Sequence, residues 1–256
     1  MARAGRVALV GAGPGDPELL TLRAARLLAE AEAVVYDRLV PQAIVERARP
    51  GAMRIDVGKG AGHHPVPQDT INALLLRLAR SGRLVVRLKG GDPFTFGRGG
   101  EEAAYLVGHG IPCEVVPGVT SASGAAAALG IPLTHRGLAT GVRYVTGHCR
   151  DDAPLDLDWS GLADPGTTLV VYMGLANIRR IACGLIEHGM PADLPAAAIA
   201  RATQAEQRLV VAPLAGIADA AQALKDQGPV LFVIGRVVEL AAVLGADASE
   251  IERAYA

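Results

Sequence analysis

The densest group of residues that can bind a small molecule lies in the segment Lys89–Glu102, which contains five glycines. Glycine has no side chain beyond Cα, so such a loop lets the main chain approach a ligand closely. Asp92 can accept hydrogen bonds from amine or hydroxyl groups, and Arg98 places a positive charge among the glycines. The segment therefore predicts a ligand-binding loop. The alternative is a long structural turn that ends in a helix-capping pair of glutamates.

A second glycine-rich loop, Gly11–Pro17, follows the first apolar run of the chain. It partly fits the G-x-G-x-x-G loop of dinucleotide-binding folds, but Asp16 stands where that pattern needs its last glycine. A carboxylate there would face the pyrophosphate. A nicotinamide site is therefore disfavoured, even though Asp37 imitates the ribose-binding acid of such folds. The other interpretation is a turn that only shapes the rim of a cleft.

Three further segments place functional side chains after predicted strands or between predicted domains. Thr120 and Ser121 begin a small-residue helix, where they either cap the helix or line a ligand. Arg136 is a candidate partner for a substrate carboxylate, although a plain hinge or surface arginine fits equally well. Met173 precedes a glycine at a strand end and faces either a cleft or the core.

Composition excludes several classes of function. The three cysteines lie far apart without a Cys-x-x-Cys pair, and the histidines show no H-x-x-H or H-E-x-x-H spacing, so neither a metal nor a disulfide framework is expected. A net charge of −1 gives no broad attraction to nucleic acid. No apolar run approaches the roughly 20 residues of a membrane-spanning helix, so no membrane partner is expected.

The scaffold is predicted from apolar β-branched runs that alternate with helical patterns. This alternation predicts two α/β domains, 1–136 and 137–256, with mostly parallel sheets covered by helices. Two strands close together around Thr203 predict an antiparallel excursion in the second domain. The predicted strands are 7–10, 33–36, 54–57, 84–88, 113–116, 142–146, 168–172, 196–200, 208–211 and, as the last one, 230–234. The predicted helices are 22–30, 41–48, 68–80, 101–107, 120–129, 178–188 and 217–225.

Taken in order, these motifs resemble those of the uroporphyrinogen-III C-methyltransferase family, from about Val7 to Val238. The ordered set is specific, whereas any single block would be a weak signal. The resemblance implies two α/β domains of the tetrapyrrole methylase type, with the active site in the interdomain cleft. The blocks that carry it are Val10–Leu20, Tyr36–Val40, Val57–Lys59, Val66–Gln68, Val85–Glu102, Val115–Gly124, Gly130–Arg136 and Val170–Asn177.

The activity implied by the resemblance is transfer of two methyl groups from S-adenosylmethionine to carbons two and seven of uroporphyrinogen III. The products are precorrin-2, which feeds sirohaem, cobalamin and haem d1 synthesis, and S-adenosylhomocysteine. The donor is already an activated sulfonium, so no metal is needed. The substrate carries many carboxylates, so arginines and lysines should line its side of the cleft. The family is typically homodimeric, so a homodimer is implied, and the widely spaced cysteines favour a soluble protein with reduced thiols in the cytoplasm.

Functional residues carry over position by position. Asp37 matches the family's proposed proton acceptor, Lys59 its proposed proton donor and Arg98 an arginine proposed to take part in proton abstraction. An arginine is a poor base at its usual pKa, so anchoring of the substrate stays an alternative role for Arg98. The resemblance implies substrate contacts from Arg38, Glu101 and Arg136. It implies methyl-donor contacts from Pro14, Gly90, Gly91, Asp92, Thr95, Thr120, Ser121, Met173 and Ala202.

Three positions depart from the family pattern, and each could alter affinity without removing a proposed catalytic group. Thr95 stands where an aliphatic residue is frequent, Gly60 where an arginine is common and Ala202 where a glycine is usual.

Two rival functions stay open. One is a sister methyltransferase that acts on a later precorrin, and the other is a non-catalytic module that binds a nucleotide or tetrapyrrole.

Overall fold

The computed structural model describes residues 5–58, 66–148, 155–244 and 251–253, together with the backbone elements within them. The chain divides into two compact units, Met1–Ser121 and Ala122–Ala256. This division falls before the boundary at 136/137 that the sequence predicts, and the extent of each functional domain stays a prediction. Among the described residues, no helix is both long and apolar enough to cross a membrane.

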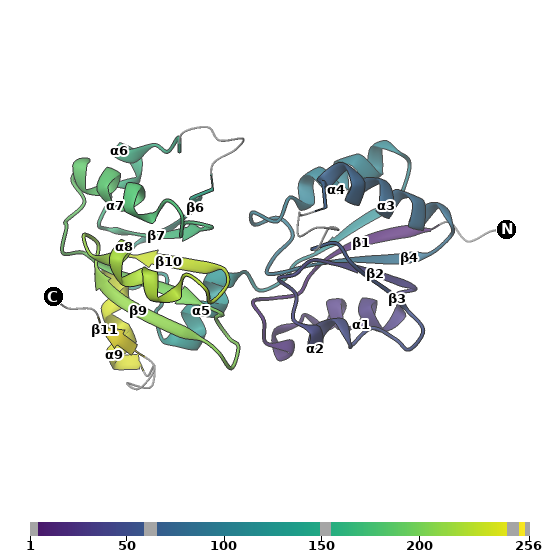
Figure 1. The fold of residues 1–256 in the computed structure, drawn as a ribbon, viewed down its shortest axis with the longest axis horizontal. Coiled ribbons are helices and arrows are strands. Elements are labelled where there is room, and N and C mark those ends of the chain that lie inside the picture. The colour runs from purple at the N-terminus through teal and green to yellow at the C-terminus, as the bar shows by residue number, and fades with distance from the viewer. Residues whose placement is uncertain (1–4, 59–65, 149–154, 245–250, 254–256) are drawn as a thin grey trace. The chain divides into compact units, whose positions relative to one another are not determined.

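The first unit is built on a parallel sheet of five strands in the order β3-β2-β4-β1-β5. Figure 1 shows α1 and α2 on one face of this sheet and α3 and α4 on the other. Its elements are β1 (Arg6–Gly11), the 3-10 helix η1 (Pro17–Leu19), α1 (Leu22–Glu30), β2 (Ala33–Tyr36), α2 (Gln42–Val45), β3 (Met53–Asp56), α3 (Gln68–Arg80), β4 (Leu84–Lys89), α4 (Gly99–Gly108) and β5 (Cys113–Val116).

Alternating side chains of the central strands bury both faces of this sheet. Val10 and Leu88 pack with α1 and α2 in one core cluster, whereas Leu9 and Val85 pack with α3 and α4 in another. The buried strands are therefore apolar on both sides, as expected for a parallel sheet covered by helices. Local signals set the helix ends. For example, the Thr21 hydroxyl accepts a hydrogen bond from the Ala24 amide at 3.1 Å and caps α1.

The second unit contains a mixed sheet of six strands in the order β11-β9-β8-β10-β7-β6. One apolar cluster packs this sheet against α7 and α8, and a second cluster packs it against α5 and η3. The elements are α5 (Ser121–Leu129), β6 (Gly141–Thr146), α6 (Trp159–Leu162), β7 (Thr167–Tyr172), α7 (Ile178–Glu187), β8 (Pro195–Ala200), β9 (Arg208–Pro213), α8 (Ile217–Ala220), η2 (Ala221–Leu224), β10 (Val230–Ile234), η3 (Arg236–Leu240), α9 (Ala241–Leu244) and β11 (Ile251–Arg253).

The predicted antiparallel excursion is confirmed, because β8 and β9 pair antiparallel. The prediction of a mostly parallel sheet is wrong for the second unit, since β10 also runs antiparallel to both β7 and β8. The predicted last strand, 230–234, is followed by β11, which pairs with β9. The predicted helix at 41–48 is confined to α2, and the predicted helix at 217–225 divides into α8 and the 3-10 helix η2.

Candidate active site

The functional residues predicted in the first unit gather at one edge of its sheet. All strand pairs in this sheet are parallel, so the carboxyl ends of the strands lie along the same edge. The loops that leave this edge are the ones in which the sequence predicts ligand contacts. They hold Pro14 after β1, Asp37 and Arg38 after β2, Gly90, Gly91, Asp92, Thr95 and Arg98 after β4, and Thr120 and Ser121 after β5. Open α/β sheets bind their ligands at this edge.

The main chains of three of these loops approach one another closely. The Gly91 amide donates to the Gly13 carbonyl at 2.7 Å, and the Gly13 amide donates back to Gly91 at 3.2 Å. A Cβ atom built at Gly118 would lie 2.2 Å from the Gly91 carbonyl oxygen and 2.9 Å from Gly11 Cα. The glycines at Gly11 and Gly118 are therefore required for the close approach of the loops after β1, β4 and β5, whereas Gly91 has a positive φ of 65°, which favours glycine.

A Gly118→Ala substitution is therefore expected to lower the free energy of unfolding by about 2 kcal/mol or more, because the new methyl group meets backbone atoms that cannot rotate away. Gly100→Ala is the matched control. No atom lies within 4 Å of a Cβ at that position in α4, and alanine favours a helix. Denaturant unfolding of both variants measures the difference. Equal stabilities would contradict the close packing of the three loops.

Asp92 fixes the shape of the loop after β4. Its Oδ1 accepts a hydrogen bond from the Phe94 amide at 2.8 Å, and its Oδ2 accepts one from the Gly118 amide at 3.1 Å. The Thr95 hydroxyl adds a contact of 3.4 Å to Oδ1. The carboxylate therefore stabilises its own turn and also connects the loop to the one that follows β5.

Asp37 lies directly after β2 with its carboxylate held from two sides. Oδ1 accepts a hydrogen bond from the Leu39 amide at 3.1 Å, while Oδ2 lies 3.4 Å from Nη2 of Arg87. The Asp37 side chain stays 25% exposed, so it is accessible from solvent although its position is fixed. The neighbouring Arg38 is exposed.

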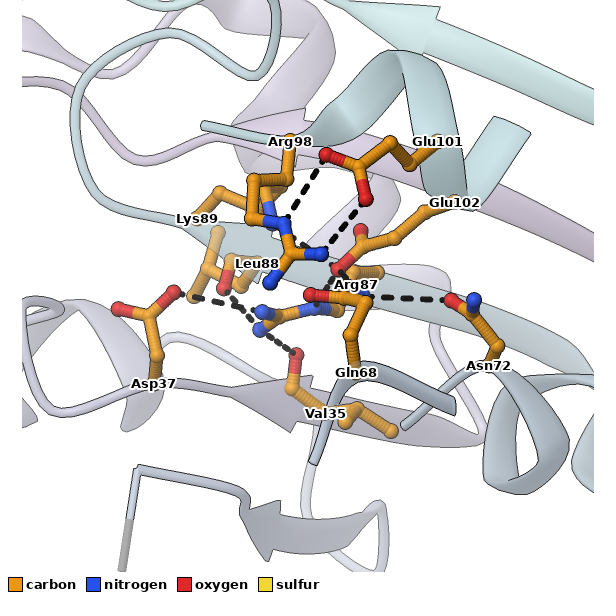
Figure 2. Close-up of polar contacts among 10 residues, drawn as sticks. All are labelled: Val35, Asp37, Gln68, Asn72, Arg87, Leu88, Lys89, Arg98, Glu101 and Glu102. Atoms are coloured by element: carbon orange, nitrogen blue, oxygen red, sulfur yellow. Dashed lines mark hydrogen bonds and ion pairs between the residues drawn. The ribbon is translucent and has the colours of Figure 1, made fainter. Parts of the chain in front are cut away.

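Arg87 belongs to a buried charged cluster that sequence analysis did not identify as functional (Figure 2). Its Nε lies 3.3 Å from Oε1 of Glu102, and Nζ of Lys89 lies 3.1 Å from the same oxygen. Gln68 donates to this oxygen at 3.0 Å. Burial lowers the pKa of Lys89, and the nearby charge of Arg87 lowers it further, whereas Glu102 acts in the opposite direction.

Arg98 and Glu101 form an exposed pair at the start of α4 (Figure 2). The Arg98 Nε and Nη2 atoms donate to the two carboxylate oxygens of Glu101 at 3.0 and 2.6 Å. These hydrogen bonds raise the pKa of Arg98 above its ordinary value. The Arg98 side chain is nevertheless 55% exposed, so an anionic ligand can reach the guanidinium.

In the second unit, Met173 and Ala202 follow strands that end at the same edge. β7 and β8 both run antiparallel to β10, so their carboxyl ends lie on the same side of the sheet. Met173 is 49% exposed and has a positive φ of 53°. Arg201 and Thr203, which flank Ala202, have φ values of 49° and 67°. A left-handed backbone is costly for such residues, and strain of this kind gathers at functional sites.

Two further predicted residues are Arg136 and Lys59. Arg136 is exposed in a turn of the second unit, between the bridged residues His135 and Ala139. Lys59, the proposed proton donor, lies outside the described residues. Within the part of the chain that the structure describes, no group of three or more histidine, cysteine or acidic side chains is arranged to hold a metal ion.

The first unit thus has the architecture of a small-molecule-binding α/β domain, and a mixed-sheet unit follows it. Residues 6–218 match the family of tetrapyrrole (corrin/porphyrin) methylases, and the chain belongs to this family. The fold and the recognition of the family on sequence motifs are therefore confirmed.

Individual relatives agree with this assignment. The chain is 57% identical over 237 residues to a uroporphyrinogen-III C-methyltransferase of Paracoccus denitrificans, covering 93% of this chain and 83% of the relative. It is 54% identical to a siroheme synthase of Azotobacter vinelandii, and it spans about half the length of that protein, 51%. A crystal structure of uroporphyrin-III C-methyl transferase from Thermus thermophilus, complexed with S-adenyl homocysteine, has a TM-score of 0.78 and 45% identity. The structural alignment covers 92% of this chain and 94% of the Thermus thermophilus chain.

Proposed function

We propose that this protein transfers two methyl groups from S-adenosylmethionine to carbons two and seven of uroporphyrinogen III, producing precorrin-2 and S-adenosylhomocysteine. The observation that carries the proposal is the gathering of Asp37, Arg98 and the glycine-rich loops at one edge of the first sheet. The names and identities of the relatives from Paracoccus denitrificans and Thermus thermophilus support the donor and the substrate.

The methyl donor is assigned to the main-chain-rich surface of the loops. Pro14, Gly90 and Gly91 offer backbone without bulky side chains, and the structural hydrogen bonds of Asp92 hold that backbone in place. Thr95, Thr120 and Ser121 add hydroxyl groups at the same edge, and Met173 and Ala202 keep their predicted role as donor contacts. The donor supplies an activated methyl group, so the protein has to align it with a pyrrole carbon and remove a proton.

Asp37 is the proposed proton acceptor. Its carboxylate is fixed by Leu39 and Arg87 and is partly exposed, so it can receive the proton that leaves the methylated carbon. Arg98 is assigned to anchoring the substrate and stabilising its charge. A guanidinium that donates two hydrogen bonds to Glu101 retains its proton, because those bonds favour the charged form. Lys59 keeps its proposed role as proton donor.

The substrate's carboxylates are assigned to exposed arginines. Arg136→Ala is expected to raise KM for the tetrapyrrole by about tenfold, the loss of one charge-assisted hydrogen-bonding partner, with kcat little changed. Arg208→Ala, which removes another exposed arginine in the same unit, is the matched control and should leave KM unchanged. Steady-state kinetics at saturating donor measures both values. An unchanged KM in Arg136→Ala would remove this residue from the substrate site.

The donor assignment is tested by ligand-induced stabilisation, because only a ligand that binds the folded state raises the unfolding temperature. S-adenosylhomocysteine is expected to raise the midpoint in proportion to the logarithm of its concentration, and NAD is expected to leave it unchanged. The opposite pattern would indicate a nicotinamide-dependent protein. A homodimeric assembly, implied by the family resemblance, and a cytoplasmic location, favoured by the cysteine pattern, belong to the same proposal, as does the absence of nucleic acid and membrane partners.

A further inference from the structure

Arg87 is buried and contacts two carboxylates, an arrangement that a residue required only for packing does not need. Arg87 lies on β4, the strand between β1 and β2, and its side chain is only 4% exposed. Its guanidinium reaches a fully buried carboxylate, Glu102, on one side and the partly exposed carboxylate of Asp37 on the other (Figure 2). A buried cation is costly to desolvate, and two hydrophobic side chains could fill the same volume more simply.

The geometry separates an anchoring end of the cluster from a working end. At the anchoring end, Nε of Arg87, Nζ of Lys89 and the Gln68 amide all converge on Oε1 of Glu102. The Arg87 Nη1 atom also donates to the carbonyl of Leu88 at 3.1 Å and to that of Val35 at 3.5 Å. These bonds leave the guanidinium little freedom to rotate. At the working end, Nη2 contacts Oδ2 of Asp37 at 3.4 Å.

We propose that Arg87 is a positioning residue for the methyl-transfer reaction, which holds the Asp37 carboxylate in one orientation through a buried connection to Glu102. The inference rests on the proposed function, in which Asp37 accepts the proton that leaves the methylated pyrrole carbon. Arg87 itself transfers no proton and does not touch the substrate. It fixes one Asp37 oxygen while the Leu39 amide fixes the other, so the carboxylate has one orientation when the substrate arrives.

Arginine suits this position better than lysine. A planar guanidinium with five N–H donors can bond to Glu102, Asp37 and two carbonyl groups at once, whereas an ammonium group on a single stem cannot span them. Arg87→Lys keeps the positive charge needed by the buried Glu102, so the variant is expected to fold. It gives up the simultaneous contact with Asp37, which is the contact that the proposal requires.

The test is a double-mutant cycle between Arg87→Lys and Asp37→Asn. Arg87→Lys alone is expected to lower kcat by about tenfold to a hundredfold through misplacement of the base, with KM for the tetrapyrrole and the Kd for S-adenosylhomocysteine within about twofold of the original protein. In the Asp37→Asn background, the same substitution is expected to cause no further loss of kcat. Arg54→Lys is the matched control, since the Arg54 guanidinium also donates to carbonyl groups of the first unit, those of Val45, Ala48 and Ala52, and none of these is a candidate site residue.

Each outcome decides the inference. Equal losses of kcat in both backgrounds, or losses that Arg54→Lys reproduces, would overturn it. If Arg87→Lys fails to fold, Glu102→Gln replaces it in the cycle, because it keeps the shape and the accepting oxygen while removing the charge that anchors Arg87. The same cycle is run on thermal midpoints. If the original protein does not methylate uroporphyrinogen III, the proposed function fails. The thermal midpoints then still test the contact between Arg87 and Asp37. Additive shifts of the midpoint in the double mutant would contradict that contact.

Discussion

An Arg98→Ala variant is expected to lose methyl transfer by about a hundredfold to a thousandfold while it stays folded and binds S-adenosylhomocysteine normally. The reason is the position of the guanidinium, which is exposed at the carboxyl edge of the sheet and held by two hydrogen bonds to Glu101. An exposed ion pair adds at most about 1 kcal/mol to stability, so its removal should hardly change unfolding. Loss of turnover would therefore report loss of charge stabilisation at the reacting substrate.

The matched control for this variant is Arg179→Ala. Arg179 also pairs with an exposed carboxylate, that of Asp219, but it lies on α7 of the second unit and matches no functional position. Single-turnover rates with uroporphyrinogen III, together with thermal midpoints, compare the two variants. Turnover retained in Arg98→Ala, or a loss of equal size in Arg179→Ala, would refute the role assigned to Arg98.

Asp92→Ala is expected to weaken binding of S-adenosylhomocysteine by about tenfold to a hundredfold, which corresponds to losing hydrogen bonds to a charged group. The structure gives a reason beyond direct contact with the ligand. The carboxylate holds the Phe94 amide and the Gly118 amide, so its removal releases the loop after β4 from the loop after β5. The backbone around Gly90 and Gly91 would then have to be ordered at the expense of binding energy.

Asp158→Ala is the control for this prediction, because Asp158 also accepts a backbone hydrogen bond, from Gly161 at 3.0 Å, and caps a helix in the second unit. Loss of that cap should lower stability slightly and leave ligand affinity unchanged. Isothermal calorimetry with S-adenosylhomocysteine measures the dissociation constants. An unchanged affinity in Asp92→Ala would place the donor elsewhere.

The first unit was predictable because its elements carry strong local signals. The helices at 22–30 and 68–80 lie at the predicted residues, since a capping Thr21 and a regular apolar spacing define them. The mixed topology of the second sheet was not predictable, because strand order and direction depend on long-range pairings such as that of β10 with both β7 and β8. Helix α6 is a single short turn within a polar segment, and no periodicity reveals it.

For the candidate site, the motifs predicted which loops carry the candidate residues but not how those loops are held together. The sequence indicates no mutual contact between Gly91 and Gly118, because that approach depends on strand order. The role of Arg87 had one signal, a charged residue flanked by apolar residues within β4, and this signal is equally consistent with an ordinary strand. The left-handed backbone at Met173 and Thr203 has no signal in residue type, since neither residue favours a positive φ.

The most direct test is an anaerobic incubation of the protein with uroporphyrinogen III and S-adenosylmethionine, followed by mass spectrometry of the tetrapyrrole. Our proposal predicts a gain of two methyl groups and formation of a matching amount of S-adenosylhomocysteine. No gain of methyl groups, in a protein that still binds S-adenosylhomocysteine, would contradict the assigned substrate and favour a later precorrin in its place.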